Sequence, residues 1–228
     1  SGVIPKMWYA PQHSLWIDSP SPFADNDSIT DSTDKESTMD YASARREAIA
    51  RAQQYLAQEP VYLDTETTGV RSSAEIIEIS VVDHSGTLLY DALVRPRHPI
   101  PVDATRIHKI TNAMVVDAPT WDAVWPQLET ILGGRPIGIF NADFDLRLLR
   151  QSHHHAGLVW PDLPLDAFCI MNLYAQFYGE WDNYRQSWRW QSLDKAQRFC
   201  KIPLRNTHRA KDDALLARAV LQHIASAT

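Results

Sequence analysis

The pattern of apolar and polar positions divides the chain into a polar N-terminal part and a longer part with regular periodicity. Residues 18–40 are rich in Ser, Asp and Thr and carry almost no large apolar side chains, so we interpret them as a flexible, acidic linker. An apolar cluster before this linker is either an arm that docks on the main domain or a peptide that binds a partner; it contains Trp8, Tyr9, Leu15 and Trp16. Residues 41–58 lack Gly and Pro and have apolar side chains near helical spacing, which predicts a helix.

Beyond Pro60 the pattern changes to short apolar runs, followed by alternating helical and strand-like segments. We predict strands at residues 61–63, 75–82, 87–94, 137–140 and 164–166. We predict helices at residues 121–132, 142–152, 167–177, 192–199 and 210–224. Three strands followed by alternating helices and strands indicate an α/β domain with a mixed sheet. We therefore expect an N-terminal extension at residues 1–59 and a folded domain at residues 60–228.

Composition narrows the protein class without changing this fold prediction. The chain has 228 residues, of which 44% are hydrophobic and 22% are charged, as in ordinary globular proteins. No apolar stretch approaches the roughly 20 residues that span a bilayer, and the start of the chain does not resemble a signal peptide. The two cysteines, Cys169 and Cys200, make neither a disulfide framework nor a zinc site. We expect a cytoplasmic protein that has no membrane partner.

Charge is distributed unevenly along the chain. The net charge of −6 argues at first against a nucleic-acid partner, but residues 181–228 hold 9 basic and 4 acidic residues. A basic end on an acidic protein suits a polyanion that must approach a carboxylate-rich site. The alternative interpretation is ordinary surface charge, and composition alone does not decide between the two.

Two carboxylates stand at the end of the first predicted strand. Asp64 and Glu66 are two residues apart, so their side chains project to the same face of the strand. Carboxylates that face one another in this way repel unless a cation lies between them, and oxygen ligands of this kind prefer magnesium or manganese. Gly69 can let the chain turn tightly and bring backbone amides close to a ligand. The alternative is an exposed strand end with incidental acidic residues.

Further candidate residues begin two later helices. Asp143 and Asp145 follow the apolar strand predicted at residues 137–140, and the carboxyl ends of strands are where α/β sheets tend to build sites. His208 precedes Asp212 and Asp213 at the start of the last predicted helix. A histidine titrates near neutral pH and can accept a proton from water during catalysis.

Three motifs together resemble one enzyme family. They are Asp-x-Glu-Thr-Thr-Gly at residues 64–69, Asn-Ala-x-Phe-Asp at residues 141–145 and His-x-Ala-x-x-Asp at residues 208–213. In this order they resemble the DEDDh exonucleases, named for an Asp-Glu-Asp-Asp quartet plus a histidine, which include the epsilon proofreading subunit of bacterial DNA polymerase III and RNase T-like ribonucleases. The stretches 76–79 and 105–111 are also similar, and the resemblance covers about residues 60–226. It implies an RNase H-like α/β fold.

The resemblance also implies a chemistry and assigns residues to it. It implies a 3′→5′ exonuclease that releases nucleoside monophosphates with two divalent ions, Mg²⁺ or Mn²⁺. The implied metal ligands are Asp64, Glu66, Asp145 and Asp213, with His208 as general base. Expected substrate-binding residues are Thr67, Thr68, Gly69, His108, Asn141, Phe144 and Arg189. His108 has a second interpretation as a histidine on a surface loop.

The family pattern selects one residue from each of two pairs of acids. It selects Asp145 over Asp143. It also selects Asp213 over Asp212, although a helix that began at His208 would place Asp212 nearer to that histidine. The choice of Asp213 requires His208 to lie on a loop before the helix. Phe140 departs from the family, since many relatives have a histidine there, and we expect the departure to affect substrate contacts.

Two other features have competing interpretations. Residues 153–155 are three consecutive histidines, which point about 100° apart on a helix and cannot easily share one ion; we interpret them as a solvated helix end. Residues 181–190 interleave Trp181, Tyr184, Trp188 and Trp190 with Arg185 and Arg189. Such a pattern either binds single-stranded nucleic acid, with aromatic rings stacked on bases and arginines at phosphates, or packs its tryptophans over the core. We expect packing by the tryptophans and phosphate contact by at least one arginine.

The expected partner is nucleic acid with a free 3′ end, and we favour DNA over RNA. A polymerase or another protein partner is a further expectation, since some relatives are polymerase subunits. A catalytically silent binding or docking module is the alternative from another class, but such a module has no use for mutually repelling acids.

Overall fold

A central mixed sheet organises the part of the chain that the computed structural model describes, which is residues 40–161 and 165–228. Its strands are β1 (Val61–Thr67), β2 (Ile76–Val82), β3 (Leu88–Leu93), β4 (Ile137–Ile139) and β5 (Ala167–Cys169). Their order is β3-β2-β1-β4-β5. The pairs β1–β2 and β2–β3 are antiparallel, whereas β1–β4 and β4–β5 are parallel. The expected mixed α/β fold is therefore confirmed. The apolar arm and nearly all of the expected acidic linker lie outside the described residues.

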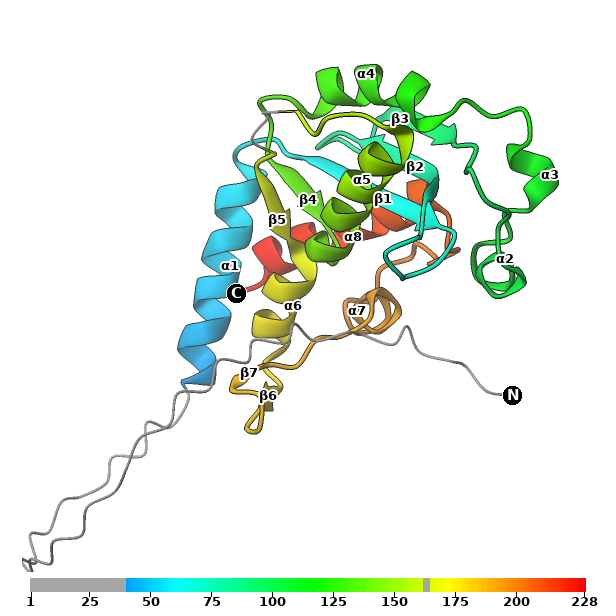
Figure 1. The fold of residues 1–228 in the computed structure, drawn as a ribbon. Helices are drawn as coiled ribbons and strands as arrows, with labels where there is room; N and C mark the ends of the chain where they lie inside the picture. Colours follow the sequence, from blue (N-terminus) through cyan, green and yellow to red (C-terminus); the bar gives the residue numbers. More distant parts are fainter. Residues whose placement is uncertain (1–39, 162–164) are drawn as a thin grey trace, which may run out of the picture. The chain divides into compact units, whose positions relative to one another are not determined.

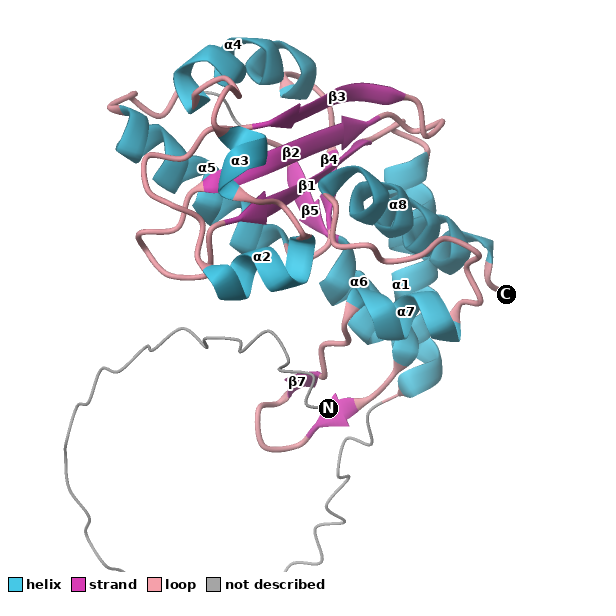
Figure 2. Ribbon diagram, turned by 90° about the vertical axis from the view of Figure 1, so that its right-hand side faces the viewer, coloured by secondary structure: helices cyan, strands magenta, loops and turns pink. Residues whose placement is uncertain are grey.

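Helices cover both faces of this sheet (Figure 1). The helices are α1 (Tyr41–Leu56), α2 (Val102–His108), α3 (Asn112–Val115), α4 (Trp121–Leu132), α5 (Ala142–Ala156), α6 (Ile170–Tyr178), α7 (Leu193–Phe199) and α8 (Ala210–Ser226). Figure 2 shows α4 and α5 on one side of the strands and α8 on the other. A small hairpin of β6 (Trp181–Asp182) and β7 (Ser187–Trp188) follows α6.

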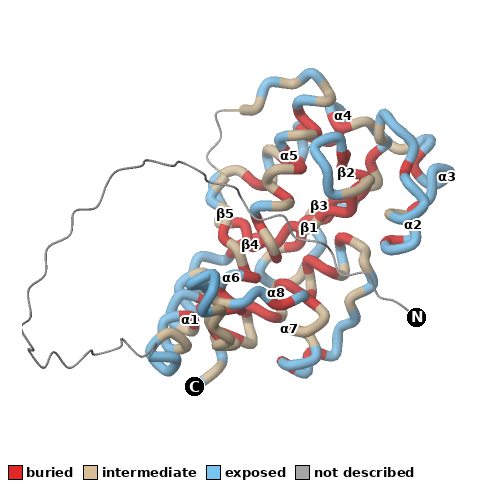
Figure 3. Tube along the Cα trace, turned by 60° about the horizontal axis from the view of Figure 1, so that its bottom comes forward, coloured by how far each residue is buried: buried red, intermediate tan, exposed pale blue. Residues whose placement is uncertain are grey.

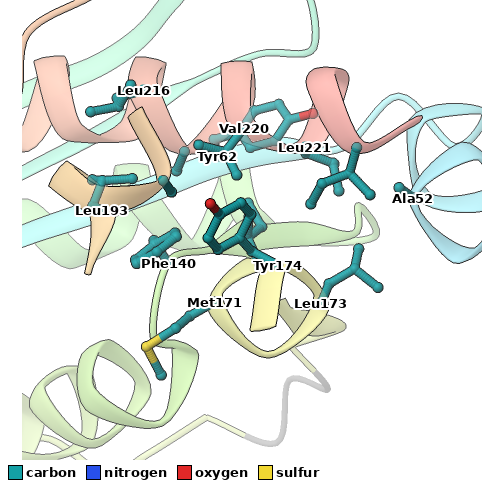
Figure 4. Packing of buried hydrophobic residues seen from close by; sticks show 14 of the residues in the cluster. Ala52, Tyr62, Phe140, Met171, Leu173, Tyr174, Leu193, Leu216, Val220 and Leu221 are labelled. Atoms are coloured by element: carbon teal, nitrogen blue, oxygen red, sulfur yellow. The ribbon is translucent and has the colours of Figure 1, made fainter. Parts of the chain in front are cut away.

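Side chains along β1 point alternately to the two faces of the sheet, so β1 contributes residues to a hydrophobic core on each face. Tyr62 belongs to the core that contains α1, α6 and α8, whereas Leu63 belongs to the core that contains α4 and α5. Figure 4 shows Tyr62, Phe140 and Tyr174 in the first core, beside Val220 of α8. Buried residues follow the strands and the inward sides of the flanking helices (Figure 3). Since successive residues of β1 face opposite cores, Asp64 and Glu66 lie on the side of Tyr62 and α8.

The last predicted strand, at residues 164–166, and the helix after it, at residues 167–177, are both present but begin three residues later than predicted; residue 164 itself lies outside the described residues. The strand is β5 at Ala167–Cys169, and the helix starts only at Ile170. Gly138 on β4 is paired with Phe168 on β5, and a Cβ at Gly138 would lie 2.9 Å from the Phe168 ring. The missing side chain of Gly138 therefore makes room for Phe168, and this parallel pairing overrides the local pattern that favours a helix.

The interpretation of the three histidines as a solvated helix end is wrong for His153. Helix α5 extends to Ala156, and His153 is buried against Trp121, Trp125 and Trp160, with ring centroids 4.3 Å apart for the Trp125 pair. Its Nδ1 lies 2.9 Å from the carbonyl oxygen of Leu149. This histidine is thus part of the aromatic packing between α4 and α5.

Candidate active site

The first two site residues lie at the end of β1. Glu66 is buried, and Asp64 is partly buried. The β1–β2 register is irregular between Glu66 and Thr67, directly beside the site. Irregularities of this kind redirect side chains at strand ends and occur often next to active sites. The strand end therefore presents two carboxylates on the α8 side, just before the backbone departs from regular pairing after Glu66.

The start of α8 brings the histidine and the last acid to this strand end. Among the described residues, Glu66, His208 and Asp213 form one cluster in which a ligand atom from each lies within 4.8 Å of the others. Helix α8 begins at Ala210, so His208 lies before the helix, with a left-handed φ of 54°. Asp213 is buried, whereas Asp212 accepts a hydrogen bond from the Thr207 hydroxyl at 2.6 Å. The structure thus places Asp213, and not Asp212, beside His208.

The start of α5 contributes a further buried acid, which is hydrogen-bonded to β1. Asp145 is 3% exposed and accepts a hydrogen bond from the Thr65 hydroxyl at 2.7 Å. Asp143 is exposed. Asn141 precedes the helix with a left-handed φ of 79°, which sets the direction in which α5 leaves β4. Of the two candidate acids, Asp145 is the one turned toward the sheet.

The loop after β1 is held by its own threonines. The Thr67 hydroxyl donates to the Gly69 carbonyl oxygen at 2.7 Å, and the Thr68 hydroxyl accepts from the Glu75 amide at 2.9 Å. A Cβ added to Gly69 would meet no described atom within 4 Å. The space in front of Gly69 is therefore open.

His108 ends α2 and is buried, at 2% exposed, so the interpretation as a histidine on a surface loop is wrong. Its Nδ1 accepts a hydrogen bond from the Ile110 amide at 3.0 Å. Burial lowers the pKa of His108 below its ordinary value, with nearby Glu78 opposing that effect and Arg209 and His208 adding to it. His108 is therefore a neutral imidazole close to the start of α8 at neutral pH.

The remaining predicted site residues have other surroundings. Phe144 is partly buried, with the Arg147 guanidinium 5.2 Å from its ring centroid. Arg189 donates to Glu180 at 2.9 Å and lies 3.8 Å from Asp182, so its charge is already paired within the chain. Trp181 and Trp188 pack edge to face on each other, at 5.0 Å between centroids, and Trp190 is exposed, so the tryptophans do not pack into the described core clusters as expected. Phe140 is a core residue.

Sequence reasoning missed two residues, Thr65 and Glu78, that contact these groups or their neighbours. Thr65 holds Asp145, and Glu78 on β2 accepts hydrogen bonds from Arg209 and from the Ala210 amide. Thr65 lies inside the first motif and Glu78 inside the similar stretch 76–79, but a local pattern does not show which distant residue a side chain contacts. The contact partners are 80 and 131 residues apart in the chain.

The donor set of the cluster fits a hard divalent cation. It combines buried carboxylates with one imidazole, and carboxylate oxygens are the ligands that magnesium and manganese prefer. Buried carboxylates this close to one another repel, and a cation offsets that repulsion. The cluster therefore can hold a metal ion. Separately, every helix within residues 40–161 and 165–228 is too short or too polar to cross a membrane.

Comparisons with known proteins agree with this arrangement. A family model described as Exonuclease matches residues 61–221. The uncharacterized exonuclease CP81 of Escherichia phage 186 is 33% identical over 180 residues, which cover 77% of this chain and 92% of the phage protein. Exodeoxyribonuclease 10 of Escherichia coli (strain K12) is 35% identical over 112 residues, which cover 49% of this chain and 44% of that protein.

Solved structures show the same fold. Exonuclease X in complex with 5′ overhanging duplex DNA has a TM-score of 0.54 at 30% identity, covering 72% of this chain and 89% of that chain. The nuclease domain of 3′hExo, a DEDDh family member bound to rAMP, has a TM-score of 0.58 at 15% identity and the same coverage. The matched residues contain the whole sheet and the clustered side chains, and this chain therefore belongs to the exonuclease family, with the RNase H-like fold of the DEDDh type.

Proposed function

We propose that this chain is a metal-dependent 3′→5′ exonuclease that releases nucleoside monophosphates from DNA. The observation that carries the proposal is the cluster of Glu66, His208 and Asp213, whose ligand atoms lie within 4.8 Å of one another. Members of the cluster come from β1 and from the start of α8, so the fold itself assembles them. Exonuclease family membership supports a nuclease reaction at this cluster.

Two divalent ions, Mg²⁺ or Mn²⁺, are proposed to bind at Asp64, Glu66, Asp145 and Asp213. Bound cations would supply charge stabilisation for the attacking and leaving oxygens of an in-line displacement. Burial of Glu66, Asp145 and Asp213 supports this assignment, because buried carboxylates are rarely stable without a compensating charge or donor. Thr65 supplies one such donor to Asp145.

His208 is proposed to accept the proton of the attacking water. Water then adds to the terminal phosphorus, the bond to the 3′ oxygen of the preceding nucleotide breaks, and a nucleoside 5′-monophosphate leaves. The position of His208 within the cluster supports this role, since a general base must lie within hydrogen-bond reach of the water. The open space at Gly69, with Thr67 and Thr68 beside it, is proposed to receive the 3′-terminal nucleotide.

The other residues proposed to bind the substrate are supported to different degrees. His108 is buried beside the start of α8, and Asn141 and Phe144 are at the start of α5, near Asp145. Arg189 needs to leave Glu180 before it can contact a phosphate, so its support is weaker. DNA is favoured because one relative is named an exodeoxyribonuclease and one structural neighbour holds duplex DNA.

The direct test follows DNA and RNA oligonucleotides of one sequence, labelled at the 5′ end, with Mg²⁺, Mn²⁺ or a chelator. We expect a metal-dependent ladder that shortens from the 3′ end, with faster cleavage of DNA. Faster cleavage of RNA would replace the DNA assignment by an RNase T-like one. No cleavage by folded wild-type protein would contradict the enzyme proposal and favour a silent binding module.

A pair of neighbouring variants tests the site assignment. Asp213→Asn should lower turnover by more than about 100-fold, since loss of a direct ligand should exceed the roughly 10–100-fold effect of outer partners. Asp212→Asn is the matched control, because Asp212 binds Thr207 outside the cluster, and its turnover should stay within about threefold of wild type. Equal losses in both variants would show that the assignment of Asp213 is wrong.

A further inference from the structure

We propose that Glu78 on β2 is a positioning residue that holds the start of α8, and with it His208 and Asp213, against β1. The inference rests on the proposed function, because it assigns a residue that acts through the groups of that site. Glu78 itself is in the second strand and belongs to none of the three motifs. Its contacts, its burial and its place in the sheet carry the argument.

The position of Glu78 in the sheet places it beside the site. In the antiparallel β1–β2 register Glu78 is directly opposite Glu66. Directly opposite residues of an antiparallel pair project to the same face, so both side chains lie on the α8 side of the sheet. Glu78 is only 3% exposed. A carboxylate this deeply buried is strongly destabilising unless donors surround it.

Those donors all come from the start of α8. Arg209 Nε lies 3.0 Å from Glu78 Oε1 and 3.1 Å from Oε2, and Arg209 Nη2 also donates to Oε1. The Ala210 backbone N–H donates to Oε2 at 2.9 Å. The hydrogen bonds to Glu78 raise the pKa of Arg209 above its ordinary value. A fork of this kind fixes orientation as well as distance, because the guanidinium is planar and contacts the carboxylate by two of its nitrogens.

Glu78 also replaces a missing helix cap. The first amides of a helix need acceptors, and the N-cap side chain usually supplies one. In the described structure the N-cap residue Arg209 makes no side-chain cap hydrogen bond. The Glu78 carboxylate accepts the Ala210 amide instead, and its negative charge is favourable at a helix N-terminus. Glu78 on β2 therefore helps to set the residue at which helix α8 begins.

The two site residues are on either side of this anchor. His208 immediately precedes Arg209, has a left-handed φ of 54°, and its amide donates to Asn206 Oδ1 at 3.1 Å. Asp213 follows one turn later, and its amide donates to the Arg209 carbonyl oxygen at 3.0 Å. Left-handed backbone is unfavourable for a residue with a side chain, so it persists only where neighbours hold it. Release of Arg209 would let both site residues move relative to Glu66.

The experiment compares Glu78→Gln, Arg209→Gln and the double variant with Arg218→Gln as the matched control. Arg218 also links α8 to the β2–β3 end of the sheet, through the His84 carbonyl oxygen at 2.8 Å, but away from the cluster. For each variant we would measure kcat and KM on single-stranded DNA, Mn²⁺ binding by calorimetry, Tm, and hydrogen exchange of residues 206–213.

We expect Glu78→Gln and Arg209→Gln to lower kcat by about 10–100-fold, as loss of an outer-shell partner typically does, with KM changed by less than about threefold. The double variant should resemble the single variants, because both act through one contact. Mn²⁺ binding should weaken, and exchange of residues 206–213 should accelerate. Arg218→Gln should show none of these effects at a comparable change in Tm.

Three outcomes would overturn the proposal. They are wild-type turnover in Glu78→Gln, additive losses in the double variant, or equal losses in Arg218→Gln. If Glu78→Gln does not fold, Arg209→Lys tests the two-nitrogen contact instead. This variant keeps the positive charge and the Ala210–Glu78 hydrogen bond but loses the planar guanidinium. Wild-type turnover in Arg209→Lys would also contradict the proposal. A wild-type protein without nuclease activity would instead refute the proposed function itself, and the exchange data would still show whether Glu78 holds residues 206–213.

Discussion

Polar residues around the candidate site are held in pairs that join different elements. The Thr65 hydroxyl on β1 donates to Asp145 on α5, and both side chains are buried. Thr65 and Asp145 are 80 residues apart in the chain, so this hydrogen bond ties the start of α5 to β1. A carboxylate that must present its other oxygen to a ligand gains a fixed orientation from such a donor.

Replacement of Thr65 by valine should therefore weaken the site without breaking the strand. Valine has nearly the same shape and suits a strand, but it leaves the buried Asp145 without its hydroxyl donor. We expect turnover to fall by about tenfold or more and Mn²⁺ binding to weaken. Thr130→Val is the matched control, since the Thr130 hydroxyl donates to the Pro126 carbonyl oxygen within α4. Unchanged turnover in Thr65→Val would show that Asp145 does not depend on this bond.

At the scale of elements, close packing between β4 and β5 sets the position of α6. A Cβ at Gly138 would lie 2.9 Å from Phe168, 3.0 Å from Tyr62 and 3.1 Å from Ile170. Tyr55 of α1 stacks on the Phe168 ring, with ring centroids 3.7 Å apart. One glycine on β4 thus allows β1, β5 and the start of α6 to pack closely together.

The variant Gly138→Ala should destabilise the fold by overpacking. An extra methyl group against three rigid neighbours should lower the free energy of unfolding by about 1–3 kcal/mol. Urea denaturation monitored by circular dichroism would measure the loss. Addition of Phe168→Leu should recover part of it, because the smaller side chain vacates the space that the methyl group needs. A double variant less stable than the sum of both single changes would contradict this explanation.

At the scale of the whole molecule, the site depends on segments that are distant in the chain. Glu66 of β1 meets His208 and Asp213 because β1 is central in the sheet and α8 crosses its face. Helix α1 precedes the residues matched by the family model, yet it packs in the same core as α6 and α8. A domain boundary at residue 60 stays a prediction, and α1 contributes to the core that supports α8.

Stability of the whole molecule should depend on pH through His153, which is buried, and His223, which is partly buried. Burial lowers the pKa of His153 and of His223 below their ordinary values, so the unfolded chain binds protons more readily than the folded one. Their contribution to stability is therefore complete above pH 6.5 and is lost as the pH falls from there through the folded pKa values. We expect Tm to be nearly constant from pH 7 to about 8 and to fall toward pH 5.

The variant His153→Gln tests the origin of this dependence. It removes a titrating group from the aromatic packing of α4 and α5, so the difference in Tm between pH 7.5 and 5.5 should shrink. His84→Gln is the control, because His84 is exposed. If both variants keep the wild-type difference, His153 does not couple protons to folding.

The sequence by itself determined the class of fold and most elements. Periodicity depends only on neighbouring residues, and it predicted α4 at its observed bounds and α7 and α8 within two residues of theirs. The short helices α2 and α3 were missed, because one or two turns carry too little periodicity to be recognised. The motifs likewise identified Glu66, His208 and Asp213, which form the cluster in the structure. This was possible because the residues of each motif lie close together in the chain.

Only the tertiary structure decided which neighbours support those residues. Asp212 and Asp213 are adjacent in the chain, and the start of α8 at Ala210 places only the second within the cluster. Glu78 meets Arg209, and Thr65 meets Asp145, across 131 and 80 residues. Local patterns carry no information about such distances. Sheet register and the packing of α8 and α5 on the sheet determine them, because burial of both faces permits only one arrangement of these elements.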